Sequence, residues 1–301
     1  MRVFVTGASG HIASAVIPEL LDHGHHVVGL ARSDASAEAI SARGAEARRG
    51  DLDDLDGLKA AAAEADGVIH LAFKHDWMLT GDFMGAVSAD LAATQAMGEA
   101  LTGTDKPFVT TGGTLMLAMA GITDRFGTED DQSEGGPRVD AANYTIGLGQ
   151  RGVRSSVVRL APMVHSELDH HGFTPALIGF ARENGVAAYT GDGANRWPAA
   201  NTHDIGALYR LALEKAPAGS TFHGVGDTGI SRKVIAETIA GRLGVEARSI
   251  TEEQAPHYLG FLAGFAGLDN PTSNDKTREV LGWEPTHPGW IEDVENGHYF
   301  G

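Results

Sequence analysis

Residues 1–13 read MRVFVTGASGHIA, a short apolar run that leads into a glycine-rich turn and then into a helical pattern. Gly7 and Gly10 have no Cβ, so backbone amides beside them can approach an anion closely. A helix that begins near His11 would direct the positive end of its dipole at the same point. This stretch predicts a turn that holds the pyrophosphate of a dinucleotide, with Ser9 and Ile12 beside it.

The glycine spacing is a weak signal by itself, because the motif reads G-x-x-G-x-x-A with Ala13 in its third position. Its surroundings strengthen it: residues 2–6 are typical of a buried strand, and a second apolar strand follows near residues 25–32. The helix between them has apolar residues four positions apart, at Ile12, Val16 and Leu20. Pro18 falls inside this helix and is expected to kink it without ending it.

Strand-like and helix-like segments alternate as far as residue 163, with six strands in all. This alternation predicts an α/β fold, a Rossmann-type doubly wound parallel sheet with helices on both faces. Beyond Pro162 the pattern loosens, with a loop expected at residues 191–204 and a helix near residues 252–267. We therefore expect a dinucleotide-binding domain at residues 1–163. Residues 164–301 would form mainly a smaller α+β substrate lobe, with parts that pack back on the sheet.

The composition excludes several classes of function. The 301 residues are 42% hydrophobic and carry 40 acidic against 23 basic residues, a formal charge of −17 that disfavours nucleic acid as a partner. The absence of cysteine excludes disulfides, thiol catalysis and cysteine-bound metals. The sequence contains no signal-peptide pattern and no long apolar run, so we expect a cytoplasmic protein without a membrane association.

The end of the second strand indicates which dinucleotide is bound. An acidic residue there would hold the ribose hydroxyls of NAD, but this chain has Arg32 and Ser33. Arginine favours the 2′-phosphate of NADP, so NADP is predicted over NAD. Asp34 is the competing signal, although a helix N-cap is its more ordinary role.

Five stretches together resemble the short-chain dehydrogenase/reductases: TGASGHIA, GDLDD at 50–54, HLAF at 70–73, VTTGG at 109–113 and RLAPMVH at 159–165. More narrowly, the whole chain is similar to the extended members grouped with NAD-dependent epimerases and dehydratases, some of which form homodimers. The resemblance implies that Asp51 and Leu52 hold the adenine and that Leu71 and Ala72 line the ribose path. It also places Thr110 beside the cofactor and the segment from Pro162 to Val164 on the nicotinamide side.

That family reacts through a tyrosine four residues before a lysine, together with a serine or threonine at the end of the fifth strand. Thr111 would supply the hydroxyl and Tyr144 the phenol, but Leu148 stands where the lysine belongs. Without that charge Tyr144 is a weaker acid at neutral pH. Lys74, which follows HLAF, is the candidate substitute; a solvated loop lysine and a half-buried helix tyrosine remain the ordinary alternatives.

Other candidate residues lie on the loops expected around the reactive end of the cofactor. Trp77, Phe173 and Trp197 would close an apolar substrate pocket, or else pack between the lobes. His165 and His171 are candidate proton donors, or else solvent-facing histidines. No ligand spacing indicates a metal site.

Three functions are compatible with these features. The first is an NADP-dependent oxidoreductase that transfers hydride between the nicotinamide and a small, hydrophobic carbonyl compound or alcohol, with Thr111 and Tyr144 polarising the oxygen. The second is an NADP-binding redox sensor without turnover, which the missing lysine suggests. The third, an epimerase or dehydratase of nucleotide sugars, fits least well, because that chemistry needs the complete tyrosine–lysine pair.

Overall fold

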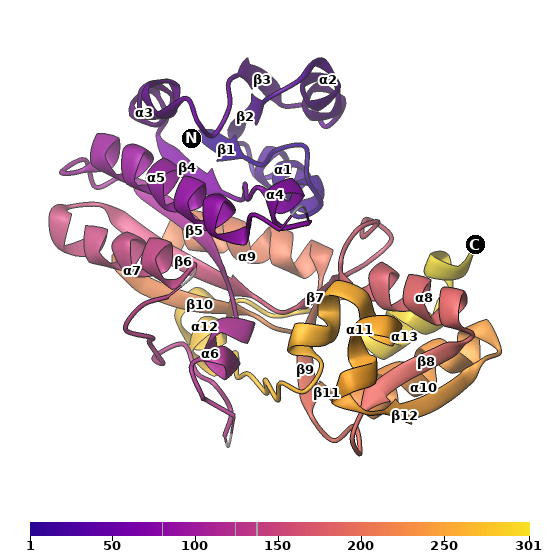
Figure 1. Ribbon diagram of the computed structural model, residues 1–301. Coiled ribbons are helices and arrows are strands. Elements are labelled where there is room, and N and C mark those ends of the chain that lie inside the picture. The colour runs from indigo at the N-terminus through magenta and orange to yellow at the C-terminus, as the bar shows by residue number, and fades with distance from the viewer. Residues whose placement is uncertain (80, 124, 137) are drawn as a thin grey trace.

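A seven-stranded parallel sheet forms the centre of the computed structural model, which describes every residue of the chain except 80, 124 and 137. The strand order is β10-β6-β5-β4-β1-β2-β3 (Figure 1). The strands are β1 (Arg2–Thr6), β2 (His26–Ala31), β3 (Glu46–Arg49), β4 (Gly67–His70), β5 (Pro107–Gly113), β6 (Arg154–Leu160) and β10 (Ser220–Gly224). The doubly wound α/β fold predicted from the alternating pattern is confirmed, with a seventh strand added by a distant part of the chain.

Helices cover both faces of this sheet because successive strand residues point to opposite sides. Val3 and Val5 of β1 pack toward α1 (Ala13–Asp22) and α9 (Thr202–Lys215), whereas Phe4 packs on the other face. That second face is covered by α3 (Leu55–Glu64), α5 (Phe83–Leu101) and α7 (Val139–Gly147). Short helices complete the domain: α2 (Asp34–Ala42), α4 (His75–Leu79), α6 (Leu115–Met119) and α12 (Asp275–Leu281).

Helix α1 begins at Ala13, two residues later than expected, and continues through Pro18 to Asp22. The prediction that this proline would not end the helix is confirmed. Pro18 lies in the second turn, where its missing N–H removes one hydrogen bond while Val16, Ile17 and Leu20 remain buried. Packing against the sheet therefore outweighs the lost bond.

A second hydrophobic core lies beside the main sheet, where β7 (Met163–His165) follows β6 along the chain (Figure 1). A three-stranded sheet is formed by β11 (Asp227–Ser231), β9 (Arg196–Asn201) and β7 (Met163–His165), and a parallel pair by β8 (Val186–Thr190) and β12 (Glu246–Ile250). Four helices pack on them, namely α8 (Phe173–Asn184), α10 (Arg232–Leu243), α11 (Ala255–Leu259) and α13 (Trp290–Glu295). Between these elements the chain returns to the main sheet through α9 and β10.

Two sequence-based expectations for this part of the chain are wrong. The predicted loop at 191–204 contains β9, in which Pro198 lacks the N–H of a regular ladder; the partner strand β11 shifts register opposite it, between Asp227 and Ile230. The predicted helix at 252–267 ends at Gly260, whose φ of +52° is incompatible with a right-handed helix. A 3-10 turn at residues 260–265 follows it.

Among the described residues, no helix is both long enough and apolar enough to cross a membrane.

Candidate active site

The glycine-rich turn joins β1 to α1 at the carboxyl edge of the sheet. Gly7 has a φ of +65°, and a Cβ on it would lie 2.8 Å from the backbone nitrogen of Ala72 and 2.9 Å from the carbonyl carbon of Leu71. Only glycine combines this dihedral angle with this close approach. The turn is closed by the N–H of Gly10, which donates to the carbonyl of Gly7 at 2.9 Å.

The N-terminus of α1 is free to bind an anion. No side chain caps it, whereas Ser33 and Asp54 cap the neighbouring helices α2 and α3. Ser9 and Gly10 are exposed in front of this helix end. The first backbone N–H groups of a helix have no partner within it, so this end offers donors and a positive dipole to a phosphate.

A buried polar network holds the strand ends behind the turn. The Thr6 hydroxyl lies 2.6 Å from Nδ1 of His70, and Nε2 of His70 lies 3.2 Å from Oδ1 of Asp90 on α5. The carboxylate only accepts, so Nε2 carries the hydrogen and Nδ1 accepts from Thr6. The N–H of Ala72 donates to the same Thr6 oxygen at 3.3 Å. These bonds fix β1 against β4 where Leu71 and Ala72 pass the turn.

Two arginines follow β2 and α2, next to the turn. Arg32 follows β2 and pairs at 3.0 Å with Asp76 on the surface. Arg43, at the end of α2, donates to the carbonyls of Ala8 at 2.6 Å and Ser9 at 3.3 Å, and partial burial lowers its pKa.

Side chains next to these arginines have structural roles of their own. Ser33 rather than Asp34 is the N-cap of α2, since its hydroxyl accepts from the N–H of Ser36 at 3.1 Å, and Asp34 pairs with Arg49. Asp51 accepts from the backbone N–H of Asp53 at 3.0 Å, and Leu52 is buried in the core. The N-cap expected at Asp34 is thus one residue earlier, at Ser33.

Thr111 lies near the end of β5 and belongs to a chain of hydroxyl groups. Its Oγ1 is 2.8 Å from the carbonyl of His70 and 2.7 Å from the phenol oxygen of Tyr209 on α9. The carbonyl can only accept, so Thr111 donates to it and Tyr209 donates to Thr111. Burial raises the pKa of Tyr209 well above its usual range, which keeps this phenol protonated.

Arg138 brings a cation to the same edge. It precedes α7 with a φ of +65°, and its guanidinium carbon lies 4.0 Å from the centroid of the Phe73 ring, just beyond β4. Burial lowers the pKa of Arg138, while electrostatic attraction to Asp90 and Tyr209 opposes that change. The arginine side chain keeps its charge at neutral pH, so a positive group interacts electrostatically with Tyr209, whose hydroxyl contacts Thr111.

The face of α7 that points to the sheet carries neither a tyrosine nor a lysine. Ala141 and Thr145 are its buried residues, and the Thr110 hydroxyl donates to that of Thr145 at 3.1 Å. Tyr144 is rotated by about 100° from Thr145 on the helix. Its hydroxyl lies 3.4 Å from the carbonyl of Gln95 on α5, so it faces away from Thr111. Tyr144 is therefore a half-buried helix residue, which is the alternative to a catalytic role that the sequence allowed.

Lys74 lies between β4 and α4 and is held by an ion pair and a ring contact. Its Nζ lies 2.7 and 2.6 Å from the two carboxylate oxygens of Asp53 and 3.9 Å from the centroid of the Trp77 ring. Trp77 is 38% exposed and covers the lysine. Among the described residues, no hydrogen bond, ion pair or ring contact joins Lys74 to Thr111 or Tyr144; its observed hydrogen bonds go to Asp53, and its role as the substitute for the missing lysine stays a prediction.

Of the predicted pocket residues, His165 and Trp197 are buried. His165 is inaccessible to solvent and its Nδ1 lies 2.8 Å from Oδ2 of Asp293, so it cannot act at a substrate mouth. The indole N–H of Trp197 donates to the carbonyl of Leu268 at 3.2 Å inside the second core. Neither side chain lines a substrate pocket as expected, because both are packed between helices and strands inside the protein.

Phe173 and His171 lie on the loop and helix that follow β7. Phe173 contacts the rings of Phe261 and Phe265, with centroids 6.0 and 6.3 Å away, while His171 is exposed. Pro162 is half-buried, and Val164 packs into the main core. No group of three or more potential metal ligands occurs among the described residues.

His11 connects the turn to this loop. Its Nε2 lies 2.9 Å from Oγ1 of Thr202, which itself donates to the carbonyl of His165, so Nε2 carries the hydrogen. Nδ1 faces Oδ1 of Asp169 at 3.7 Å. Burial, followed by the charges of nearby histidines, lowers the pKa of His11 to about 4. His11 is therefore neutral at pH 7, and its hydrogen bond joins the turn to Thr202 of α9.

Sequence reasoning missed Arg43, Arg138 and Tyr209. Arg138 lies in a loop without periodicity, and Tyr209 occupies a position in α9 that reads as ordinary core. Arg43 ends α2 eleven residues after Arg32, and only the fold of that helix brings it to the turn. No local pattern identifies any of the three.

A family model described as the NAD dependent epimerase/dehydratase family matches residues 3–134. An uncharacterized protein of Schizosaccharomyces pombe is 42% identical over 302 residues, covering all of both chains. An uncharacterized protein of Saccharomyces cerevisiae is 42% identical over 298 residues, or 98% of each chain. Among solved structures, DesIV, a dTDP-glucose 4,6-dehydratase from Streptomyces venezuelae with NAD bound, matches with a TM-score of 0.77 at 18% identity, covering 99% of this chain and 96% of that one. The last likeness concerns the fold.

Proposed function

Since the chain belongs to the NAD-dependent epimerase/dehydratase family, we propose that it is an oxidoreductase that uses NADP to interconvert a small, hydrophobic carbonyl compound and its alcohol. The observation that supports this most is the uncapped α1 behind a glycine turn in which a Cβ at Gly7 would meet backbone. Such a turn fits a pyrophosphate.

The preference for NADP over NAD rests on the charges at the adenosine side. Arg32 stands after β2 where an acidic residue would repel a 2′-phosphate, and Arg43 reaches the same turn from α2. The surface ion pair between Arg32 and Asp76 is weak, so a phosphate can compete for this guanidinium. DesIV holds NAD, and the coenzyme of the present chain is our proposal.

When bound, the coenzyme supplies or accepts a hydride at its nicotinamide. The backbone N–H groups of Ser9, His11 and Ile12 would hold the pyrophosphate, since that of Gly10 is bonded to the carbonyl of Gly7.

Thr111 can turn its single hydrogen from the carbonyl of His70 to the substrate oxygen, while Tyr209 continues to donate to Thr111. Arg138 places positive charge nearby, which stabilises the negative charge that develops on the oxygen during reduction. Phe73 beneath Arg138 gives this edge an apolar surface.

A screen of aldehydes, ketones and enones with NADPH, followed at the absorbance of the reduced nicotinamide, tests the activity. For the coenzyme, Arg43→Met is expected to weaken NADPH binding at least tenfold and NADH binding by less than threefold. Arg48→Met is a matched control, because Arg48 lies on β3 and pairs with Glu64 of α3. Equal losses of both coenzymes in Arg43→Met would contradict a role with the 2′-phosphate.

A redox sensor that binds NADP without turnover is the second candidate. It is favoured by the sheet-facing side of α7, which presents Ala141 and Thr145 instead of a tyrosine and a lysine. Saturable binding of NADPH with no oxidation in the complete screen would favour the sensor. Turnover that depends on Thr111 and Arg138 would exclude it.

A further inference from the structure

Arg232 is a buried cation without a counter-ion. It begins α10, is 2% exposed, and has no hydrogen-bond partner for Nε or Nη1 among the described residues. In the same part of the chain no ion pair joins it to a carboxylate. Its guanidinium carbon lies 4.1 Å from the centroid of the Trp197 ring, a cation–π contact. Such a contact offsets only part of the cost of removing a charge from water.

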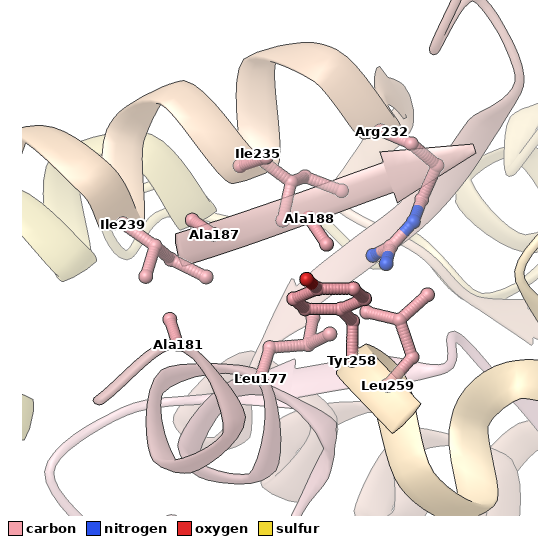
Figure 2. Close-up of a pocket in the computed structure, with 10 residues that line it drawn as sticks. Leu177, Ala181, Ala187, Ala188, Arg232, Ile235, Ile239, Tyr258 and Leu259 are labelled. Atoms are coloured by element: carbon pink, nitrogen blue, oxygen red, sulfur yellow. The ribbon is translucent and has the colours of Figure 1, made fainter. Parts of the chain in front are cut away.

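The Arg232 side chain lines a small cavity inside the second core. Figure 2 shows its guanidinium and the Tyr258 ring together at one end of this cavity, with aliphatic side chains around the rest. The aliphatic lining consists of Leu177, Ala181, Ala187, Ala188, Ile235, Ala236, Ile239 and Leu259. The enclosed space is about that of one water molecule or one halide ion.

The two polar side chains that line this cavity, Arg232 and Tyr258, can donate hydrogen bonds to a bound molecule but cannot accept hydrogen bonds from it. The Tyr258 oxygen accepts from Nη2 of Arg248 at 2.7 Å, which leaves the phenol hydrogen to be donated elsewhere. Arg232 has donors only. A water molecule would need acceptors for its own two hydrogens, and these side chains provide none. An anion needs only donors and also neutralises the guanidinium.

We propose that this cavity is a binding site for one small monovalent anion of halide size, held by Arg232. Burial lowers the pKa of Arg232 to about 10, so the guanidinium is charged at neutral pH. The anion would replace the missing carboxylate and stabilise α10 against β8 and α11. The site lies in the second core and does not depend on the function proposed for the coenzyme.

The first test compares thermal unfolding of the full chain in sodium chloride and in sodium gluconate at constant ionic strength. Gluconate is too large for the cavity. Chloride is expected to raise the Tm by roughly 2–4 °C in a saturable manner, because a ligand that binds only the folded state stabilises it. Arg232→Met should abolish this difference, and Lys233→Met, which removes an exposed charge from the next position of α10, should retain it.

The second test does not need a variant that folds. Crystals of the unmodified protein soaked in bromide are expected to show an anomalous-scattering peak in the cavity beside the Arg232 guanidinium. No peak there at a bromide concentration that saturates the thermal effect would overturn the proposal. An equal chloride effect in Arg232→Met would overturn it as well, since the stabilisation would then arise elsewhere.

Discussion

Replacing Gly7 by alanine should lower the free energy of unfolding of this protein much more than replacing Gly24 by alanine. Both glycines have positive φ angles, +65° and +76°. An alanine at such a φ costs about 1–2 kcal/mol of folding free energy. At Gly24 a Cβ would meet nothing within 4 Å, so this backbone term is the whole expected loss.

At Gly7 a steric overlap adds to this backbone cost. The new Cβ would lie 2.8–2.9 Å from backbone atoms of Leu71 and Ala72, which are fixed by the hydrogen bond from Ala72 to Thr6. Overpacking of this kind costs about 1–3 kcal/mol more. We therefore expect Gly7→Ala to lower the free energy of unfolding by about 2–5 kcal/mol, against about 1–2 kcal/mol for Gly24→Ala.

Urea unfolding of both variants at the same pH, with comparable m values, measures this difference. Coenzyme titration of the folded variants gives a second readout, in which Gly7→Ala loses at least tenfold in affinity and Gly24→Ala is unchanged. Equal destabilisation of the two variants would refute the close approach of the turn to the end of β4.

The remaining predictions concern the reacting edge and the pH dependence of stability. On a substrate found by the screen, Arg138→Met should lower kcat/KM by about 100-fold or more, with partial recovery in Arg138→Lys; an unchanged rate would remove Arg138 from the mechanism. Tyr144→Phe should change kcat/KM by less than about twofold, because the hydroxyl faces α5; a loss of two orders of magnitude would restore Tyr144 as the acid. Burial lowers the pKa of His223 to about 3, so the unfolded chain binds a proton below about pH 6.5 that the folded protein does not, and stability falls as the pH falls through this range. Because the lowered pKa of His11 acts in the same direction, both proteins should lose stability between pH 7 and pH 5 in urea titrations, but His223→Gln should lose up to about 2 kcal/mol less than the wild-type protein; an equal loss in both proteins would contradict this origin.

The main sheet could be predicted from the sequence because its signals are local. An apolar run, a glycine turn and a helical pattern follow one another within residues 1–22, and the same alternation recurs as far as β6. The second core was predicted less well. Pro198 makes the sequence of β9 look like that of a loop. The register shift in β11 that accommodates this proline can be seen only once the two strands are paired.

In the candidate site, the sequence likewise predicted single side chains less well where their positions depend on contacts between distant segments. Tyr144 has the residue type that the family resemblance requires, but the register of α7 turns Thr145 toward the sheet instead. His165 follows a strand as a site residue would, yet Asp293 from the distant end of the chain pairs with it in the core. Such long-range contacts leave no trace in the spacing of nearby residues.

Isothermal titration calorimetry with NADPH and NADH tests most directly whether the turn at Gly7 binds a pyridine dinucleotide. The predicted result is saturable binding of one coenzyme per chain, tighter for NADPH and abolished or strongly weakened in Gly7→Ala. Absence of heat from either coenzyme with folded wild-type protein, at two temperatures, would contradict it.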